Sequence, residues 1–137
     1  MIELTSEEKE ETLQKYRNEW KLDCNINQLN LGDRIFTISS VRQKWFQKKS
    51  ETKSILFKLN KAKERLIRES LQLDNDVILS RKALESSAKD NDKVRKCIEL
   101  IDYNNEILEI CQCACDNINS TGYDIRNMVE WLKINSN

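Results

Sequence analysis

Apolar residues recur every three or four positions between Val94 and Ile118, and this is the strongest pattern in the chain. The spacing matches an α-helix, and its seven-residue repeat defines two rows of side chains. The rows consist of Val94, Ile101, Leu108 and Cys115, and of Cys97, Asn104, Cys111 and Ile118. Further apolar residues beside them are Ile98, Ile107, Ile110 and Ala114. A helix that is apolar over so much of its circumference needs partners on more than one side, from its own domain or from a second copy of the chain.

The N-terminal half also predicts helices. Thr5 and Glu8 have the spacing of a capping box, and a helical stripe follows to about Leu22 through Leu13, Tyr16 and Trp20. The residues 23–25 predict a break, and a second helix is expected from near Asn27. Its apolar face is predicted to contain Leu31, Ile35, Ile38 and Trp45, and then a heptad-like row of Ile55, Leu59, Ala62, Leu66 and Leu73.

The C-terminal half predicts a connector and two helices. Residues 74–92 are rich in Asp, Asn and Ser and are interpreted as a connector with one short helix. The heptad helix should begin between Ser87 and Asp92 and end at 120–122, where Gly122 suits a left-handed cap. A last short helix is expected around Ile125, Met128, Val129 and Leu132. Since no segment alternates as a strand does, the predicted fold is all-α, with long helices.

Composition supports long helices and an intracellular protein. The 137 residues include no Pro and two Gly, and 34% are charged. This length predicts one domain, or one domain with an appendage, and a core so modest that self-association is expected. The start is acidic where a secretory signal would be basic and then apolar, and no apolar run approaches a membrane span. Five Cys, an odd number in a chain without a signal, indicate reduced thiols and the cytoplasm.

The residue types argue against an enzyme and against a bound cofactor. The chain has no His, so the commonest general base near neutral pH is missing. Gly32 and Gly122 stand alone and cannot form a Gly-rich phosphate cradle. Cys111, Cys113 and Cys115 suggest a metal site, but residues two apart on a helix point in nearly opposite directions, so Cys113 should face away from the other two. We therefore interpret these Cys as packing residues and predict no metal ligand.

Charge is divided into three blocks although the net charge is zero. Residues 1–41 carry five Lys/Arg and eight Asp/Glu (−3), residues 42–68 carry ten and two (+8), and residues 69–137 carry eight and thirteen (−5). The basic block is either a solvated helix face or a track for a polyanion. Aromatic residues interleave with its Lys residues, as on single-strand binders. Trp45 also lies on the apolar stripe and fits the core better, whereas Phe46 or Phe57 is freer to stack.

Two stretches resemble the UvsY family, the recombination mediators of T-even-type bacteriophages. The first is Lys44-Trp45-Phe46 followed by Lys48-Lys49. The second begins with Leu-Glu-Ile-Cys at Leu108 and continues with Ala114, Asp116, Ile118, Ser120, Gly122, Tyr123 and Ile125. Chain length and the acidic start are also similar, and the resemblance covers most of the chain, least clearly over 73–86.

The resemblance implies a ring-like homo-oligomer, a hexamer or heptamer, that binds single-stranded DNA in the cytoplasm of an infected bacterium. It implies that this ring helps to load a RecA-like phage recombinase onto DNA covered by the phage single-strand-binding protein. Residues 1–73 would contain the DNA-binding block, 42–68, and residues 93–137 would drive assembly. The candidate oligomerisation residues are Ile101, Leu108, Cys111, Cys115, Ile118 and Met128.

The family's DNA-contacting motif is a Lys/Arg cluster with Ala and Leu between. Residues 61–66 look similar although Glu64 intrudes, and an alignment without gaps from Trp45 brings Arg68 to the motif instead. The candidate DNA-binding residues are Lys44, Lys48, Lys49, Lys53, Lys58, Lys61, Lys63, Arg65 and Arg68. None belongs to a base-reading motif, so binding should not depend on sequence. The alternative is a helical scaffold or adaptor that binds other proteins, with a basic face that serves only solubility.

Overall fold

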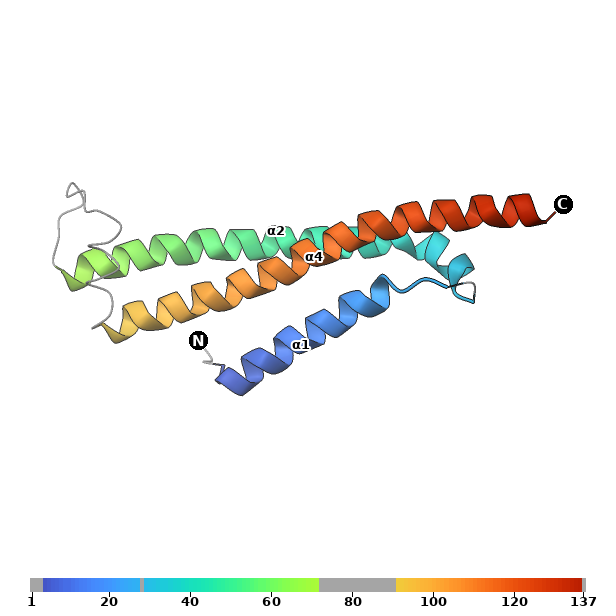
Figure 1. Cartoon of the computed structure of the whole chain (residues 1–137). Helices are drawn as coiled ribbons and strands as arrows, with labels where there is room; N and C mark the ends of the chain where they lie inside the picture. The colour runs from blue at the N-terminus through green and yellow to red at the C-terminus, as the bar shows by residue number, and fades with distance from the viewer. Residues whose placement is uncertain (1–3, 28, 72–90, 137) are drawn as a thin grey trace. The chain divides into compact units, whose positions relative to one another are not determined.

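The described part of the chain is helical throughout, as predicted. The computed structural model describes residues 4–27, 29–71 and 91–136. It contains three helices, α1 (Ser6–Asp23), α2 (Leu31–Ser70) and α4 (Asp92–Asn135), shown in Figure 1. Leu73 and residues 74–90 of the connector lie outside the described residues, and so does the short helix predicted there.

Local hydrogen bonds explain where α1 begins and where the chain breaks. The capping box is confirmed, because the Thr5 N–H donates to Glu8 Oε2 at 2.8 Å and the Glu8 N–H donates to Thr5 Oγ1 at 3.2 Å. The break after Asp23 is also confirmed. However, α2 begins at Leu31 rather than near Asn27. The reason is that Asn27 Oδ1 accepts from the N–H groups of Leu29 and Asn30, at 2.9 and 3.0 Å, and holds a turn there.

Helix α2 is continuous, but its buried row differs from the predicted one. Ile55 is exposed and its neighbour Leu56 is buried, and Ile35 is also exposed. The buried positions are Leu31, Val41, Trp45, Thr52, Leu56 and Ile67. Trp45, Leu56 and Ile67 are eleven residues apart, which is 3.67 residues per turn and not the 3.5 of a heptad. The heptad prediction for this segment was therefore wrong at Ile55, whereas the predicted Leu59, Ala62 and Leu66 are half-buried.

Helix α4 runs through Gly122 without interruption, so the predicted cap and the separate last helix are wrong. Thr121 keeps helical geometry, and its hydroxyl donates to the carbonyl of Asn117 at 2.8 Å. Ile118, Thr121 and Ile125 are buried on both sides of the glycine. A single Gly in a helix costs about 1 kcal/mol relative to Ala, and this burial outweighs it.

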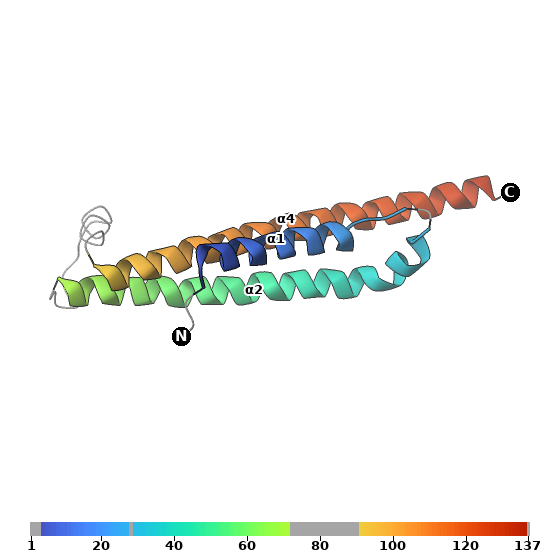
Figure 2. The same cartoon turned by 90° about the horizontal axis from the view of Figure 1, so that it is seen from below.

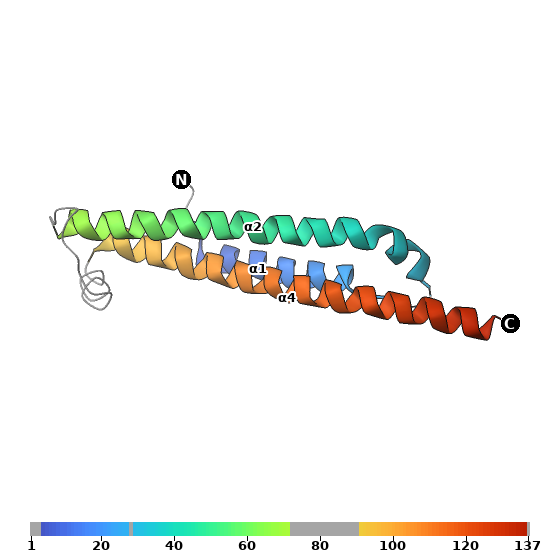
Figure 3. The same ribbon diagram turned by 90° about the horizontal axis from the view of Figure 1, so that it is seen from above.

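The chain divides into two compact units, each with its own buried residues. Unit 1 comprises Met1–Glu51 and Ile107–Asn137, and unit 2 comprises Thr52–Glu106. In unit 1, α1 lies beside the other helical segments (Figure 2), and Leu13, Trp45 and Ile118 are buried. In unit 2, the end of α2 runs antiparallel beside the start of α4 (Figure 3). There Ile67 and Val94 form a cluster against which Leu66 and Ile98 pack.

The predicted rows of α4 are mostly confirmed by burial. Val94, Cys97, Ile101, Asn104, Cys111, Cys115 and Ile118 are all buried, and Leu108 is half-buried. Ile107, Ile110 and Ala114, the further apolar residues beside the two rows, are buried too, which confirms the broad apolar face. The polar member, Asn104, is satisfied within its own helix, since its side-chain amide donates to the carbonyl of Leu100 at 2.8 Å.

We predict that Gly122→Ala stabilises the protein by about 0.5–1 kcal/mol, because Gly122 lies inside a helix. A Cβ at this position would lie 3.3 Å from Arg42 Nη2, the end of a flexible side chain that can shift. Urea unfolding followed by circular dichroism measures the change. Gly32→Ala, where a Cβ meets nothing within 4 Å, is the matched control. A loss of stability specific to Gly122→Ala would indicate the left-handed cap instead.

Candidate nucleic-acid interface

Four basic residues form a continuous row on the outer face of α2 in unit 2. Lys58, Lys61, Arg65 and Arg68 follow one another at spacings of three, four and three residues. At 100° per residue they lie within roughly 80° of each other, opposite the buried Leu56 and Ile67. The first three are exposed and Arg68 is half-buried. We call these four residues the basic row, and its length is about 15 Å.

Phe57 adds an exposed aromatic ring beside the basic row. Its side chain is 61% exposed, which is unusual for a large apolar residue. The ammonium of Lys61, one turn further along, lies over the ring at 4.5 Å from its centroid. The row therefore offers positive charge and an open π-face together.

The two other basic candidates of unit 2 lie off this row. Lys53 is exposed, but it lies roughly 60° from Leu56 around the helix and so beside the buried side. Lys63 is half-buried towards the core. Its charge acts on the Cys97 thiol, whose pKa is raised by burial and lowered in smaller measure by Lys63. Lys63 is thus placed for packing more than for ligand contact.

In unit 1, Lys44 is held by two carboxylates of α1. Its Nζ lies 3.0 Å from Glu19 Oε1 and 2.5 Å from Asp23 Oδ2. Burial alone would lower the pKa of Lys44, but hydrogen bonds to Asp23 and Glu19 and their charges raise it. The same Asp23 oxygen accepts the indole N–H of Trp45 at 2.9 Å. Trp45 is fully buried, so its predicted core role is confirmed.

The remaining two candidates are also engaged in unit 1. The ammonium of Lys48 lies 3.8 Å from the centroid of the Tyr16 ring, on α1. Lys49 is half-buried, and its charge acts on the thiols of Cys111 and Cys115. The sequence grouped nine basic residues into one block, whereas the structure divides them between unit 1, where Lys44 and Lys48 contact α1, and unit 2, where four form the basic row.

All six predicted oligomerisation residues are at least half-buried by their own chain, five of them in the apolar rows of α4. Cys111, Cys115 and Ile118 are buried in unit 1, and Ile101 is buried in unit 2. Leu108 is half-buried with them. Met128, also half-buried, is the sixth and lies nearest the C-terminus. Direct contact of these side chains with another copy stays a prediction.

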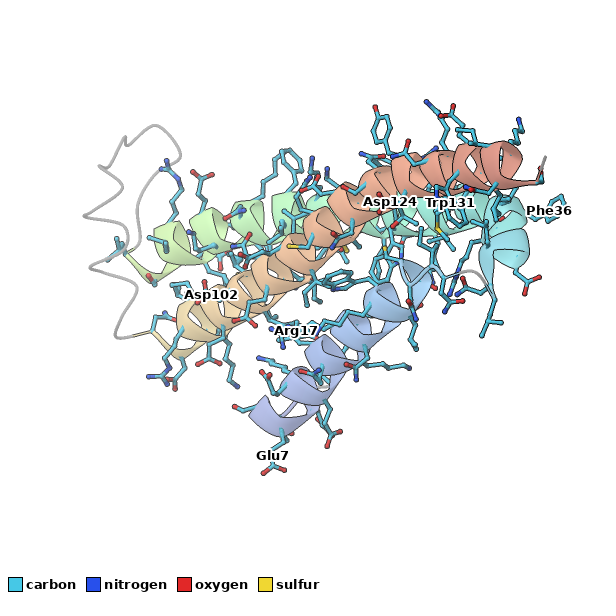
Figure 4. The ribbon with its side chains drawn as sticks, turned by 45° about the vertical axis from the view of Figure 1, so that its right-hand side comes forward. Glu7, Arg17, Phe36, Asp102, Asp124 and Trp131 are labelled. Atoms are coloured by element: carbon cyan, nitrogen blue, oxygen red, sulfur yellow. The ribbon has the colours of Figure 1, made fainter. Side chains whose placement is uncertain are left out.

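The sequence reasoning missed an exposed apolar face at the end of α4. Tyr123, Trp131 and Ile134 are 65%, 55% and 76% exposed. Their spacings of eight and three residues place them within roughly 80° around the helix. Figure 4 marks Trp131 on this segment. The periodicity was present in the sequence, but it was assigned to a separate short helix whose inward face was taken as Met128, Val129 and Leu132.

The three closely spaced cysteines diverge, as predicted. Cys113 is exposed while Cys111 and Cys115 are buried. Burial raises the pKa of Cys111 to about 11, and it also raises the pKa of Cys115. A thiol with a raised pKa is a poor metal ligand and a poor nucleophile near neutral pH. Their side chains fit a packing role.

None of the described helices contains an apolar stretch able to cross a bilayer.

Comparisons with known proteins give one family. The profile of the family described as "Recombination, repair and ssDNA binding protein UvsY" matches residues 19–137. Among curated protein sequences none matches the chain. A crystal structure of the bacteriophage T4 recombination mediator protein UvsY, lattice type II, has a TM-score of 0.75 and 18% identity over 91% of this chain and 98% of that one. The lattice type IV structure gives 0.74 and 20% over 90% and 98%. At this identity the likeness establishes a shared fold.

Proposed function

Because this chain belongs to the UvsY family, we propose that it is a recombination mediator that binds single-stranded DNA without sequence specificity. In this proposal it helps to load a RecA-like recombinase onto DNA covered by single-strand-binding protein, in the cytoplasm of an infected bacterium. The observation that carries the proposal is the basic row of Lys58, Lys61, Arg65 and Arg68 on the outer face of α2. It is not a catalytic function.

The basic row suits phosphate contacts. Each Lys or Arg that neutralises a phosphate releases condensed counterions, and this term is independent of base sequence. Glu64 and Glu69 lie nearby, and Arg65 Nε is 3.9 Å from Glu69 Oε1, but that pair is exposed and contributes little. A phosphate can therefore replace Glu69 as the partner of Arg65 with little loss of free energy.

Phe57 supplies the preference for a single strand. The bases of a duplex are stacked on one another, whereas an unpaired base can stack on an exposed ring. Lys61 lies over one side of the Phe57 ring, so it is positioned to hold a phosphate next to a stacked base. Stacking tolerates every base, which agrees with binding that is blind to sequence.

Assembly multiplies these weak contacts. We propose a ring-like homo-oligomer, a hexamer or heptamer, in which residues 93–137 drive assembly and residues 42–68 contact DNA. The exposed Tyr123, Trp131 and Ile134 support a contact between copies, because aromatic and aliphatic side chains of this size are enriched at interfaces. Several basic rows on one ring raise the effective concentration of binding sites along the strand.

The mediator role follows from such a ring. A strand held by several subunits is presented in a defined path, which weakens the hold of the competing single-strand-binding protein and offers the strand to the recombinase. The competing proposal is a helical adaptor whose basic face serves only solubility. The two differ in one property, since only the mediator needs DNA binding that weakens steeply with salt.

We predict that Lys58→Ala/Lys61→Ala/Arg65→Ala/Arg68→Ala weakens binding to single-stranded DNA and flattens the slope of log affinity against log salt by roughly 2–3, at about 0.7 per lost phosphate contact. Helicity should remain, because Ala is a better helix former. Filter binding of a labelled oligonucleotide at several salt concentrations measures both quantities, and poly-pyrimidine and mixed sequences should lose equally.

A charge-matched variant separates local contact from net charge. Lys15→Ala, Lys21→Ala, Lys93→Ala and Lys96→Ala remove four exposed cations that lie outside the basic row and outside the face of Tyr123, Trp131 and Ile134. This control should keep the wild-type salt slope. An unchanged slope in the basic-row variant would move the site away from Lys58–Arg68, and salt-insensitive or absent binding by the wild type would favour the adaptor.

We further predict that Phe57→Ala weakens binding to single-stranded DNA by roughly 5- to 150-fold, the equivalent of about 1–3 kcal/mol for one stacked base. The salt slope and the affinity for duplex DNA should stay as in the wild type, because no charge is removed. Phe57→Trp should retain binding. Ile55→Ala, an exposed aliphatic residue of the same helix, serves as the control. Equal losses on duplex and single strand would contradict a stacking role.

For assembly, we predict that Tyr123→Ser/Trp131→Ser/Ile134→Ser shifts the protein to smaller species in sedimentation velocity at micromolar concentration. The wild type should sediment as a homo-oligomer. Phe36→Ser is the control, since Phe36 is 86% exposed and lies outside this face (Figure 4). A monomeric wild type would contradict the assembly proposal, and an unchanged oligomer in the triple variant would place the interface elsewhere.

A further inference from the structure

Helix α1 contacts two basic residues of α2 in unit 1, Lys44 and Lys48. Glu19 and Asp23 bind the Lys44 ammonium, and the Tyr16 ring lies under the Lys48 ammonium at 3.8 Å. Helix α1 is acidic, with six Asp/Glu against four Lys/Arg. Its carboxylates therefore lie beside the Lys44 ammonium, where a phosphate of bound DNA would be attracted by the same positive charge.

The contacts that hold α1 include one fully buried residue, Leu13, and the ion pairs of Glu19 and Asp23 with Lys44. The Glu19–Lys44 pair is partly exposed, and exposed pairs contribute about 0–1 kcal/mol. A groove of about 410 Å³ opens beside this pair, and its lining includes the carboxylate of Glu51. Solvent therefore reaches Lys44 while α1 is in place.

The end of α1 is anchored separately from the rest of the helix. Arg34 Nη2 donates to the carbonyl of Leu22 at 2.6 Å, and Arg34 Nε donates to the carbonyl of Asn25 at 3.1 Å. The Thr121 hydroxyl, which donates to the carbonyl of Asn117, also lies 3.4 Å from the carbonyl oxygen of Cys24. The Arg34 bonds hold the junction between α1 and α2. This junction is thus held by bonds other than those to Lys44.

We propose that α1 is a self-inhibitory latch that covers Lys44 and Lys48, and that single-stranded DNA displaces it to extend the binding surface along α2. This inference rests on the proposed DNA-binding function and adds its regulation. Phosphate oxygens replace the carboxylates of Glu19 and Asp23 on Lys44, and the departure of the Tyr16 ring lets a phosphate approach the Lys48 ammonium. Strands too short to reach this part of α2 leave the latch closed and bind the basic row alone.

The test neutralises the latch without removing its hydrogen bonds. Glu19→Gln/Asp23→Asn keeps side chains of the same shape, and an Asn at 23 still accepts from the Trp45 indole N–H. We expect tighter binding of a long oligo-dT at low salt, because the strand no longer has to displace two carboxylates from Lys44. Adding Lys44→Ala to this variant should abolish half or more of the gain in affinity.

The matched control is Glu7→Gln/Glu11→Gln, which changes the net charge of α1 by the same amount. Both residues are exposed, and Glu7 points into solvent at the start of α1 (Figure 4). An equal gain in the control overturns the latch, because general electrostatics then explains the effect. No gain in the latch variant, with ordinary salt-sensitive binding by the wild type, overturns the latch and leaves the proposed function standing. Absence of salt-sensitive binding in every variant overturns both.

A second measurement uses the unmodified protein. A released α1 of 18 residues is marginal as an isolated helix. Its backbone amides should therefore exchange hydrogen faster when long oligo-dT is added, while the buried start of α4 around Val94 and Cys97, in unit 2, is unchanged. Slower or unaltered exchange in α1 on DNA binding would overturn the proposal.

Discussion

The breadth of the apolar face of α4 is the constraint on which the rest of the structure depends. One helix cannot cover its two heptad rows together with the neighbouring apolar residues Ile107, Ile110 and Ala114. In unit 1 the face is buried together with Trp45 of α2 and Leu13 of α1. The chain thus uses α1 and α2 as covers, and the polar surfaces of these two helices become the outer surface of unit 1.

Burial of one face dictates which charges lie on the outer side of the helix. On α2 of unit 2, Leu56 and Ile67 point inwards, and the 11-residue spacing of the buried positions brings four cations into one outer row. Lys63 falls on the inner side and is half-buried. In unit 1 the same helix meets an acidic partner, and Lys44 becomes a tertiary contact. A single basic block in the sequence therefore has two physical roles.

Much of the fold could be predicted because it depends on local periodicity. The capping box at Thr5, the break at Asp23, the buried rows of α4 and the divergence of Cys113 from Cys111 and Cys115 all follow from helical geometry. The errors occurred where local rules are weak. Gly122 looked like a cap because a lone Gly lowers helix propensity, but burial of Thr121 and Ile125 on either side outweighs about 1 kcal/mol. The α2 row was misplaced at Ile55 because Ile55 and Leu56 are equally apolar.

The sequence by itself determined the all-α class, the charge of the 42–68 block and membership of the UvsY family, because composition, period and residue order are properties of the chain alone. Only the tertiary structure decided which members of that block are open to solvent. Lys44 meets Glu19 and Asp23 across 25 and 21 positions of sequence, and no local pattern encodes such a contact. It forms because α1 folds back along unit 1, where Leu13 is buried, and this brings its carboxylates to a cation of α2.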